Sequence, residues 1–203
     1  MQAVDDSTPT SKIKVGLFFG SFNPVHVGHL IIANIMAEAT DLSKVWMVVS
    51  PQNPHKPARG LLHEFDRYDM VRAAVYDHDK IEASDVEFHL PRPSFTIHTL
   101  VYLQEKHPNK EFRVIMGEDN LENFIRWKNF ERILEDYGIY VYRRPGAKPS
   151  PLRDHPNVTM VDAPLLDISA TFIRNCVRKG QSIRYLVPDP VEEMIRARGY
   201  YLQ

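Results

Sequence analysis

The segment Val15–Ala39 constrains the fold more than any other part of the chain. Its first part, Val15–Phe19, has the length and apolar character of a buried strand, and Leu30–Ala39 is typical of a helix. Between them, residues 20–29 contain two glycines, a proline and two histidines. A strand, a tight turn and a helix in direct succession are typical of α/β proteins. The free N–H groups at the helix start predict an anion-binding site.

Strand-length apolar runs alternate with helix-like stretches along the rest of the chain. The expected strands are Lys14–Phe19, Val45–Val49, Ile81–Ala83, Phe112–Met116, Ile139–Tyr142 and Val158–Val161. The expected helices are Leu30–Ala39, Glu64–Tyr76, Ser94–Glu105, Glu118–Phe124, Asn129–Glu135, Ala170–Arg178 and Val191–Arg198. This order predicts a Rossmann-like, doubly wound α/β fold. Its sheet should be mostly parallel, with five to six strands and helices on both faces. Ligands should bind beyond the carboxyl ends of the strands.

Composition limits the classes of partner. The length of 203 residues suits one domain, which we expect at 13–203 after a polar, disordered tail at 1–12. The formal net charge of −1 argues against a nucleic-acid or membrane-surface partner, and no apolar run approaches the roughly 20 residues of a membrane span. The single cysteine, Cys176, excludes an intrachain disulfide and favours a reducing, cytoplasmic location. Assembly into a homo-oligomer is left open.

The first motif places His26 and His29 at the predicted start of a helix. Imidazole N–H groups can donate to phosphate oxygens beside the free N–H groups of the helix. Pro24 makes the approach rigid, and Gly28, which has no Cβ, lets a ligand come close to the backbone. Two alternatives remain. The histidines could cap a turn and pack in the helix, or they could bind zinc, although no third ligand is near.

The second motif is the run from Ile168 to Arg174. Asp167 or Ser169 can cap the following helix, and the hydroxyl groups of Ser169 and Thr171 would lie at its start. Arg174, about one turn further on, is long enough to reach back to an anion there. The alternative is an ordinary capped helix with a solvated arginine. Two helix starts of this kind in one chain predict a polyphosphate ligand, and therefore nucleotide chemistry.

Together the motifs resemble the nucleotidyltransferase superfamily with His-x-Gly-His and Ile-Ser-x-Thr-x-x-Arg signatures. Within that superfamily, the chain is similar to bacterial nicotinate-nucleotide adenylyltransferases over nearly everything from Lys14 to Tyr201. Further segments that match this family are Pro51–Lys56, Ser94–Leu100, Gly117–Asp119 followed by Trp127, Arg144–Gly146 and Tyr185–Pro188 with Val191.

The resemblance implies adenylyl transfer. The 5′-phosphate of nicotinate mononucleotide would attack the α-phosphorus of ATP and release pyrophosphate. The product, nicotinate adenine dinucleotide, is an intermediate in NAD biosynthesis. The attacking group is already an anion, so catalysis should come from positioning and charge neutralisation rather than from a protein nucleophile. Mg²⁺ is expected to enter with ATP, held by phosphates and water, with no metal ligand from the side chains.

The resemblance also implies roles for individual residues. His26, His29 and Arg174 are the expected catalytic residues: the histidines at the α- and β-phosphates of ATP, and Arg174 with Thr171 at the β- and γ-phosphates. The further residues expected to bind ATP are Gly20, Ser21, Phe22, Gly28, Gly117, Asp119, Arg144, Ile168 and Ser169. The residues expected to bind the acceptor are Asn23, Lys56, Thr96 and Trp127.

Several of these roles have alternatives. Trp127 is expected to stack on the pyridine ring but could be a core aromatic. Asp119 is expected to accept from ribose hydroxyl groups but could cap a helix. Lys56 could hold an acceptor phosphate or an ATP phosphate, or be a solvated loop lysine. Backbone N–H groups near Thr96 are expected to bind the carboxylate of the acceptor.

The chain departs from the usual family pattern, Gly-Gly-Thr-Phe-Asp-Pro, at Phe19 and Asn23, and it has Phe95 where the family has tyrosine. Two other functions stay open. One is a nucleotidyltransferase with another acceptor, nicotinamide mononucleotide or phosphopantetheine. The other is a non-catalytic nucleotide-binding module, against which the retained phosphate motifs argue.

Overall fold

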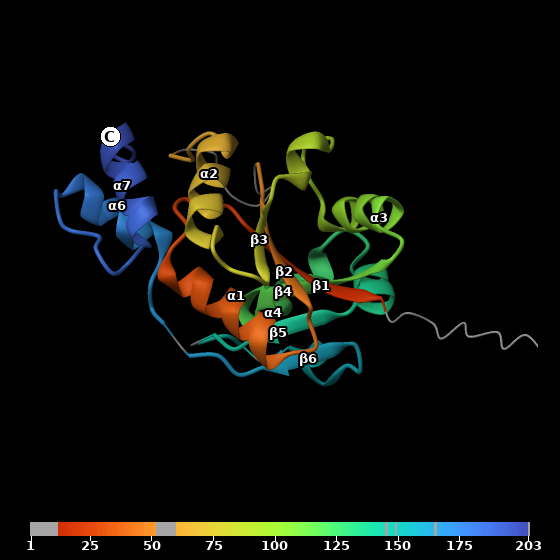
Figure 1. Ribbon diagram of the computed structural model, residues 1–203. Helices are drawn as coiled ribbons and strands as arrows, with labels where there is room; N and C mark the ends of the chain where they lie inside the picture. The colour runs from red at the N-terminus through yellow and green to blue at the C-terminus, as the bar shows by residue number, and fades with distance from the viewer. Residues whose placement is uncertain (1–11, 52–59, 145, 149, 165, 203) are drawn as a thin grey trace, which may run out of the picture.

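A parallel sheet organises the computed structural model (Figure 1). The structure describes residues 12–51, 60–144, 146–148, 150–164 and 166–202. Within these residues, the strands are β1 (Ile13–Gly20), β2 (Lys44–Val49), β3 (Ile81–Ser84), β4 (Lys110–Gly117), β5 (Ile139–Tyr142) and β6 (Val158–Val161). Their order is β3-β2-β1-β4-β5-β6, and every pairing is parallel. The expected α/β sheet is therefore confirmed, at the upper end of the predicted strand number.

Helices follow most of the strands. The α-helices in the described residues are α1 (Val27–Ala39), α2 (Glu64–Val75), α3 (Thr96–Lys106), α4 (Glu118–Asn123), α5 (Phe130–Arg132), α6 (Ala170–Arg178) and α7 (Asp189–Arg198). Shorter helical turns are η1 (Val86–His89), η2 (Phe124–Arg126), η3 (Ile133–Tyr137) and η4 (Pro151–Asp154). The expected elements all occur, and the differences concern where they begin and end.

The helices bury both faces of the sheet. The core on one face combines residues of α1, α2, α6 and α7, including Met36, Met70 and Ile173. The core on the other face combines residues of α3, α4 and η3, including Leu100 and Leu121. In Figure 1, α6 and α7 lie together beside α2. Burial on both faces explains why strands such as β2 are nearly continuous apolar runs rather than alternating ones.

Two helical regions show the largest differences from the sequence prediction. Helix α1 begins at Val27 instead of Leu30, because His26 takes the N-cap position and the Val27 N–H donates to the Leu186 carbonyl at 3.0 Å. The expected helix over 129–135 is a short α5 that continues as the π-helical turn η3. A tertiary contact and an altered helical pitch leave no clear mark in apolar periodicity.

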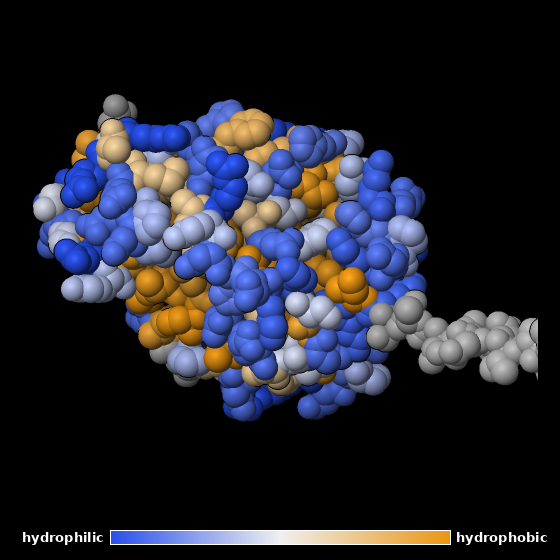
Figure 2. Space-filling model, in the orientation of Figure 1, coloured by the Kyte–Doolittle hydropathy of each residue, from blue (hydrophilic) through white to orange (hydrophobic). Residues whose placement is uncertain are grey.

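The face in Figure 2 is largely hydrophilic, and hydrophobic side chains gather on it over α1. That helix carries the half-buried Leu30, Ile31 and Ile35. Across the described ranges, no helix combines the length and hydropathy needed to cross a bilayer.

Candidate active site

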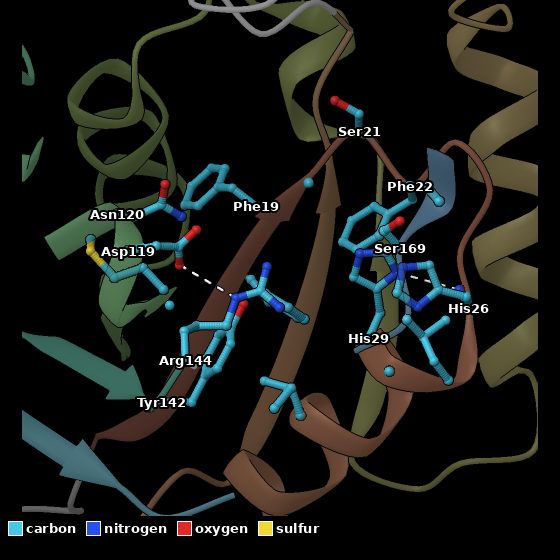
Figure 3. Close-up of a pocket in the computed structure, with 18 of the residues that line it drawn as sticks. Phe19, Ser21, Phe22, His26, His29, Asp119, Asn120, Tyr142, Arg144 and Ser169 are labelled. Atoms are coloured by element: carbon cyan, nitrogen blue, oxygen red, sulfur yellow. Dashed lines mark hydrogen bonds and ion pairs between the residues drawn. The ribbon is translucent and has the colours of Figure 1, made fainter. Parts of the chain in front are cut away.

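A cavity of about 430 Å³ opens at the carboxyl edge of the sheet. Its walls come from the ends of β1, β4 and β5 and from the starts of α1 and α6 (Figure 3). This volume is in the usual range for small-molecule and cofactor pockets. The cavity lies at the edge where the fold class predicts a ligand, beside the neighbouring strands β1 and β4.

Most residues singled out from the sequence meet in this cavity. Those that line it are Gly20, Ser21, Phe22, Asn23, His26, Gly28, His29, Gly117, Asp119, Trp127, Arg144, Ile168, Ser169, Thr171 and Arg174. Lys56 lies outside the described residues. Thr96 is the first residue of α3 and is not among the residues that line the cavity.

The two histidines stack on each other at the start of α1. Their ring centroids are 3.7 Å apart, with an interplanar angle of 27°. The backbone N–H of His26 donates to Nδ1 of His29 at 3.3 Å. Because Nδ1 of His29 accepts a hydrogen bond, the proton of the neutral ring is at Nε2. His29 therefore has a donor on the side opposite to this bond.

His26 is held in its neutral form. Its side chain is 5% exposed, and burial, followed by the positive charge of Arg144, lowers the pKa of His26 to about 4. Its buried Nδ1 has no hydrogen-bond partner within the described part of the chain. An imidazole that is neutral at pH 7 can supply a hydrogen bond but not a full charge.

The turn before α1 is tightly packed around Phe22. This residue has a φ of 44°, a left-handed conformation that is unusual for a bulky side chain. Its ring meets the ring of His29 edge-on, with centroids 5.0 Å apart. A Cβ on Gly20 would lie 2.7 Å from the Phe22 ring, and a Cβ on Gly28 would lie 3.1 Å from Nδ1 of His26. In this structure the missing side chains of the two glycines leave room for the rings of Phe22 and His26. For Gly28, the sequence motif predicts a different reason, the close approach of a ligand to the backbone.

The start of α6 faces the same cavity. The Ser169 hydroxyl accepts from the Phe172 N–H at 3.2 Å, so Ser169 is the N-cap, one of the two residues predicted for that position. Arg174 turns back toward the helix start, where its Nη2 donates to the Thr171 hydroxyl at 3.1 Å. Its Nη1 donates to the Asn23 carbonyl at 2.7 Å. This second bond ties α6 to the turn that precedes α1.

A separate group of residues forms the opposite wall, on the left of Figure 3. Arg144 Nε lies 3.5 Å from a carboxylate oxygen of Asp119. Gly117 is required for this arrangement, since a Cβ there would lie 2.4 Å from Asp119 Oδ1. Phe19 and Tyr142 line the same wall. The wall thus combines aromatic surface with one ion pair.

Two residues expected to bind the acceptor lie in different surroundings. Trp127 is half-buried and meets the ring of Phe124 at a centroid distance of 5.4 Å, so it is neither a free surface ring nor a fully buried core residue. Asn23 is 7% exposed, and its amide already makes three bonds. It donates to the Gly60 carbonyl and accepts from the Leu62 N–H and the Tyr201 hydroxyl. Asn23 thus connects the turn before α1 to the segment at residues 60–62 and to Tyr201.

Some lining residues were missed by sequence reasoning. Asn120 and Tyr142 line the cavity next to residues that were expected there. Tyr142 ends a predicted strand, and Asn120 directly follows the Gly117–Asp119 motif. Their positions at the carboxyl ends of strands could have identified them as lining residues. Pro164 and Leu166 also line the cavity, and no pattern marked them.

The described residues contain no group of three or more His, Cys, Asp or Glu side chains that could hold a metal ion. Asp119, the acidic side chain among the described residues that line the cavity, is paired with Arg144. The other charged side chains that line the cavity are Arg143 and Arg174. A surplus of positive charge in a partly enclosed site attracts anions.

The chain matches a known family over most of its length. Residues 17–176 match the model of the cytidylyltransferase-like family. With the parallel sheet and the two helix starts in one cavity, this match places the chain among the nucleotidyltransferases.

Relatives define the family more closely. The chain is 60% identical over 189 residues to a probable nicotinate-nucleotide adenylyltransferase of Cytophaga hutchinsonii, covering 93% of this chain and 98% of the relative. It is 50% identical over 191 residues to a probable nicotinate-nucleotide adenylyltransferase of Flavobacterium johnsoniae, covering 93% and 99%. The chain belongs to the nicotinate-nucleotide adenylyltransferase family and is an enzyme.

Solved structures share the fold at low sequence identity. Plasmodium falciparum nicotinic acid mononucleotide adenylyltransferase, complexed with NaAD, aligns with a TM-score of 0.78 at 20% identity, over 93% of this chain and 97% of that chain. The same protein complexed with APC aligns with a TM-score of 0.77 at 19% identity. These alignments show that the fold described above is shared with those proteins.

Proposed function

We propose that this enzyme transfers the adenylyl group of ATP to nicotinate mononucleotide, which yields nicotinate adenine dinucleotide and pyrophosphate for NAD biosynthesis. The observation that carries the proposal is the joining of two phosphate-type helix starts in one cavity. Arg174 on α6 bonds to the Asn23 carbonyl before α1 at 2.7 Å, so both N-termini can act on one polyphosphate.

The reaction needs little from a protein base. An oxygen of the acceptor's 5′-phosphate forms a bond to the α-phosphorus of ATP, and the bond from that phosphorus to the bridging oxygen breaks. Pyrophosphate leaves with the electron pair. Since the attacking oxygen is already anionic, the protein accelerates the step by alignment and by stabilising the developing charge.

The residues of the cavity suit that task in different ways. His29 would donate from Nε2 to an oxygen of the transferring phosphate, while neutral His26 supports its ring by stacking and offers a hydrogen bond of its own. Arg174, Thr171 and the N-terminus of α6 would hold the β- and γ-phosphates. The backbone of Ser21 and Phe22, with Gly20 and Gly28, would line the path of the α-phosphate.

The opposite wall would hold the nucleosides. Asp119 would bind ribose hydroxyl groups and Arg144 would line the adenine side; both line the cavity next to Gly117. Trp127 offers a half-exposed indole face on which the pyridine ring of the acceptor can stack. We keep Lys56 as a proposed phosphate ligand on the resemblance of its loop alone.

ATP carries a divalent cation into such reactions. We propose Mg²⁺, bound through phosphate oxygens and water, because the described residues offer no group of acidic and imidazole side chains that could cage an ion. The cation would neutralise charge on the triphosphate, and the protein would bind the complex. We also propose a cytoplasmic location, which fits a chain with one cysteine.

The experiment is pyrophosphate release with ATP, Mg²⁺ and each of three acceptors: nicotinate mononucleotide, nicotinamide mononucleotide and phosphopantetheine. Mass spectrometry of the products identifies the bond that formed. We expect rapid release with the nicotinate acceptor and slower release with the amide.

Each alternative has its own result in this assay. Equal rates with acid and amide would remove the acceptor preference from the proposal. Turnover on phosphopantetheine alone would assign the chain another acceptor. Binding of ATP without release from any acceptor would indicate a nucleotide-binding module.

A further inference from the structure

A fully buried arginine lies behind the active-site turn. Arg67, in the first turns of α2, is 0% exposed and does not line the cavity. Its guanidinium donates to four backbone carbonyl groups. The acceptors are Ser21 at 2.5 Å, Ser50 at 2.8 Å, Pro51 at 2.9 Å and Leu62 at 2.9 Å.

The charge of Arg67 is unusual for its position. Buried arginines are normally ion-paired, but within the described residues this guanidinium makes no ion pair. Burial lowers the pKa of Arg67 to about 10, so the group stays charged at neutral pH. A buried charge whose hydrogen bonds all go to carbonyl groups, with the Glu64 carboxylate acting only from a distance, is costly for stability, which makes a role beyond stability worth testing.

The four carbonyl groups belong to three segments of the chain, one of which lines the cavity at Ser21. Ser21 follows β1, Ser50 and Pro51 follow β2, and Leu62 precedes α2. One planar group with donors in a fixed fork therefore fixes the relative positions of three segments. No lysine could make the same four bonds, because an ammonium group has three donors on one atom.

A short chain of contacts leads from Arg67 to His29. The carbonyl that Arg67 holds belongs to Ser21, and the next residue is Phe22, with its φ of 44°. Residues in such conformations persist when their surroundings hold them from several sides. On the far side, Asn23 is held by Gly60 and Leu62. The Phe22 ring then lies against the ring of His29.

We propose that Arg67 is a positioning residue for adenylyl transfer. By holding the Ser21 carbonyl, it keeps Phe22 in its left-handed conformation, and the Phe22 ring keeps His29 aimed at the transferring phosphate. The catalytic step in this statement rests on the proposed function. The structural step, from Arg67 to His29, does not depend on which acceptor the enzyme uses.

The test compares Arg67→Lys and Arg67→Met with the same changes at Arg72. Arg72 lies on the same helix, and its side chain is 68% exposed. We expect kcat to fall about 100-fold in both Arg67 variants, because small misplacements of catalytic groups have effects of that size. The KM for ATP should change less than about threefold, since the ground-state contacts are retained. The Arg72 variants should match the wild type.

A spectroscopic readout separates positioning from general stability. In protein labelled with ¹³C-histidine, the ring signals of His29, assigned by their loss in His29→Gln, should shift in Arg67→Lys. The signals of His155, which lies before β6, should not. Melting midpoints of all variants set an assay temperature at which each one is folded.

Each possible result either supports or contradicts the proposal. A reduced kcat together with shifted His29 signals supports the proposal. It is overturned if Arg67→Lys turns over normally, if its kcat falls with His29 signals unchanged, or if it does not fold. An inactive wild type would refute the proposed function instead, and the His29 signals would still decide the structural step.

Discussion

His26 and His29 belong to one motif, yet the fold gives them different chemistry. His26 is buried and has its pKa lowered to about 4, so it acts as a neutral group. His29 accepts from the backbone of His26 at Nδ1, which directs its own donor elsewhere. The sequence predicts that both histidines lie near an anion. It does not predict the lowered pKa of His26, because that depends on burial and on the charge of Arg144, which follows a strand far along the chain.

Replacing His29 should therefore impair the chemical step. We expect His29→Ala to lower kcat by about 100- to 1000-fold, the loss typical for removing one donor to a developing charge. The KM for ATP should change little, because other groups, Arg174 and Thr171 among them, are proposed to hold the triphosphate. Steady-state pyrophosphate release checks this, with His155→Ala as the control. A near-normal kcat would mean that His29 only binds or packs.

His26 should make stability depend on pH. In the unfolded chain its imidazole titrates near pH 6.5, whereas in the folded protein it titrates near 4. Between these values the unfolded state binds more protons, so the free energy of unfolding falls as the pH is lowered. The loss should reach about 3 kcal/mol by pH 4.

Urea unfolding between pH 7 and pH 4.5 tests this expectation, with His26→Gln for comparison. The variant keeps a neutral polar side chain and should show a shallower dependence on pH. Parallel curves for the two proteins would show that His26 does not carry the effect.

At the scale of elements, the start of α6 stabilises its own helix and is also the proposed binding site of the triphosphate. Ser169 caps the helix through its hydroxyl, 3.2 Å from the Phe172 N–H. We expect Ser169→Ala to lower the free energy of unfolding by about 1 kcal/mol, the usual value for a lost N-cap. Urea unfolding measures this change.

A second substitution at this position separates the two roles. Ser169→Asp keeps an N-cap acceptor and favours the helix dipole, so stability should be retained. Its negative charge at the cavity should nevertheless raise the KM for ATP by about tenfold or more, because like charges repel in a partly enclosed site. If both variants bind ATP like the wild type, the start of α6 does not contact the triphosphate.

Helices and strands could be predicted from the sequence where a local pattern of apolar residues determines them. The strands follow from apolar runs, and the ends of β1, β4 and β5 pointed to much of the cavity wall. Arg67 shows where this reasoning stops. It lies on the apolar side of α2, three and four positions before the buried Met70 and Val71, so a charge in a core position was the available signal. What it binds is backbone from other segments, which side-chain patterns do not encode.

At the scale of the whole molecule, one bond joins distant parts of the chain. The Tyr201 hydroxyl donates to Asn23 Oδ1 at 2.9 Å, across 178 positions, and both side chains are buried. Sequence reasoning could not predict these partners of Asn23, because they come from segments far along the chain.

Removing this hydroxyl should weaken the fold without creating a cavity. We expect Tyr201→Phe to lower the free energy of unfolding by about 1 kcal/mol, the typical net value of one buried hydrogen bond. Tyr185→Phe, at a residue 80% exposed, is the matched control and should change nothing. Thermal and urea unfolding provide the measurement, and equal stability of the two variants would contradict the expectation.

The pairing of β1 with β4 also affects how the molecule folds. These strands are neighbours in the sheet, with Ile13 opposite Lys110, although the described residues between them in the sequence form two other strands, three α-helices and the turn η1. The long loop between the two strands must close, at a cost in conformational entropy, before the strands can form their stabilising contacts. This requirement slows folding. The cavity walls from β1 and β4 therefore form late, and recovery of ATP binding during refolding should follow the pairing of these two strands.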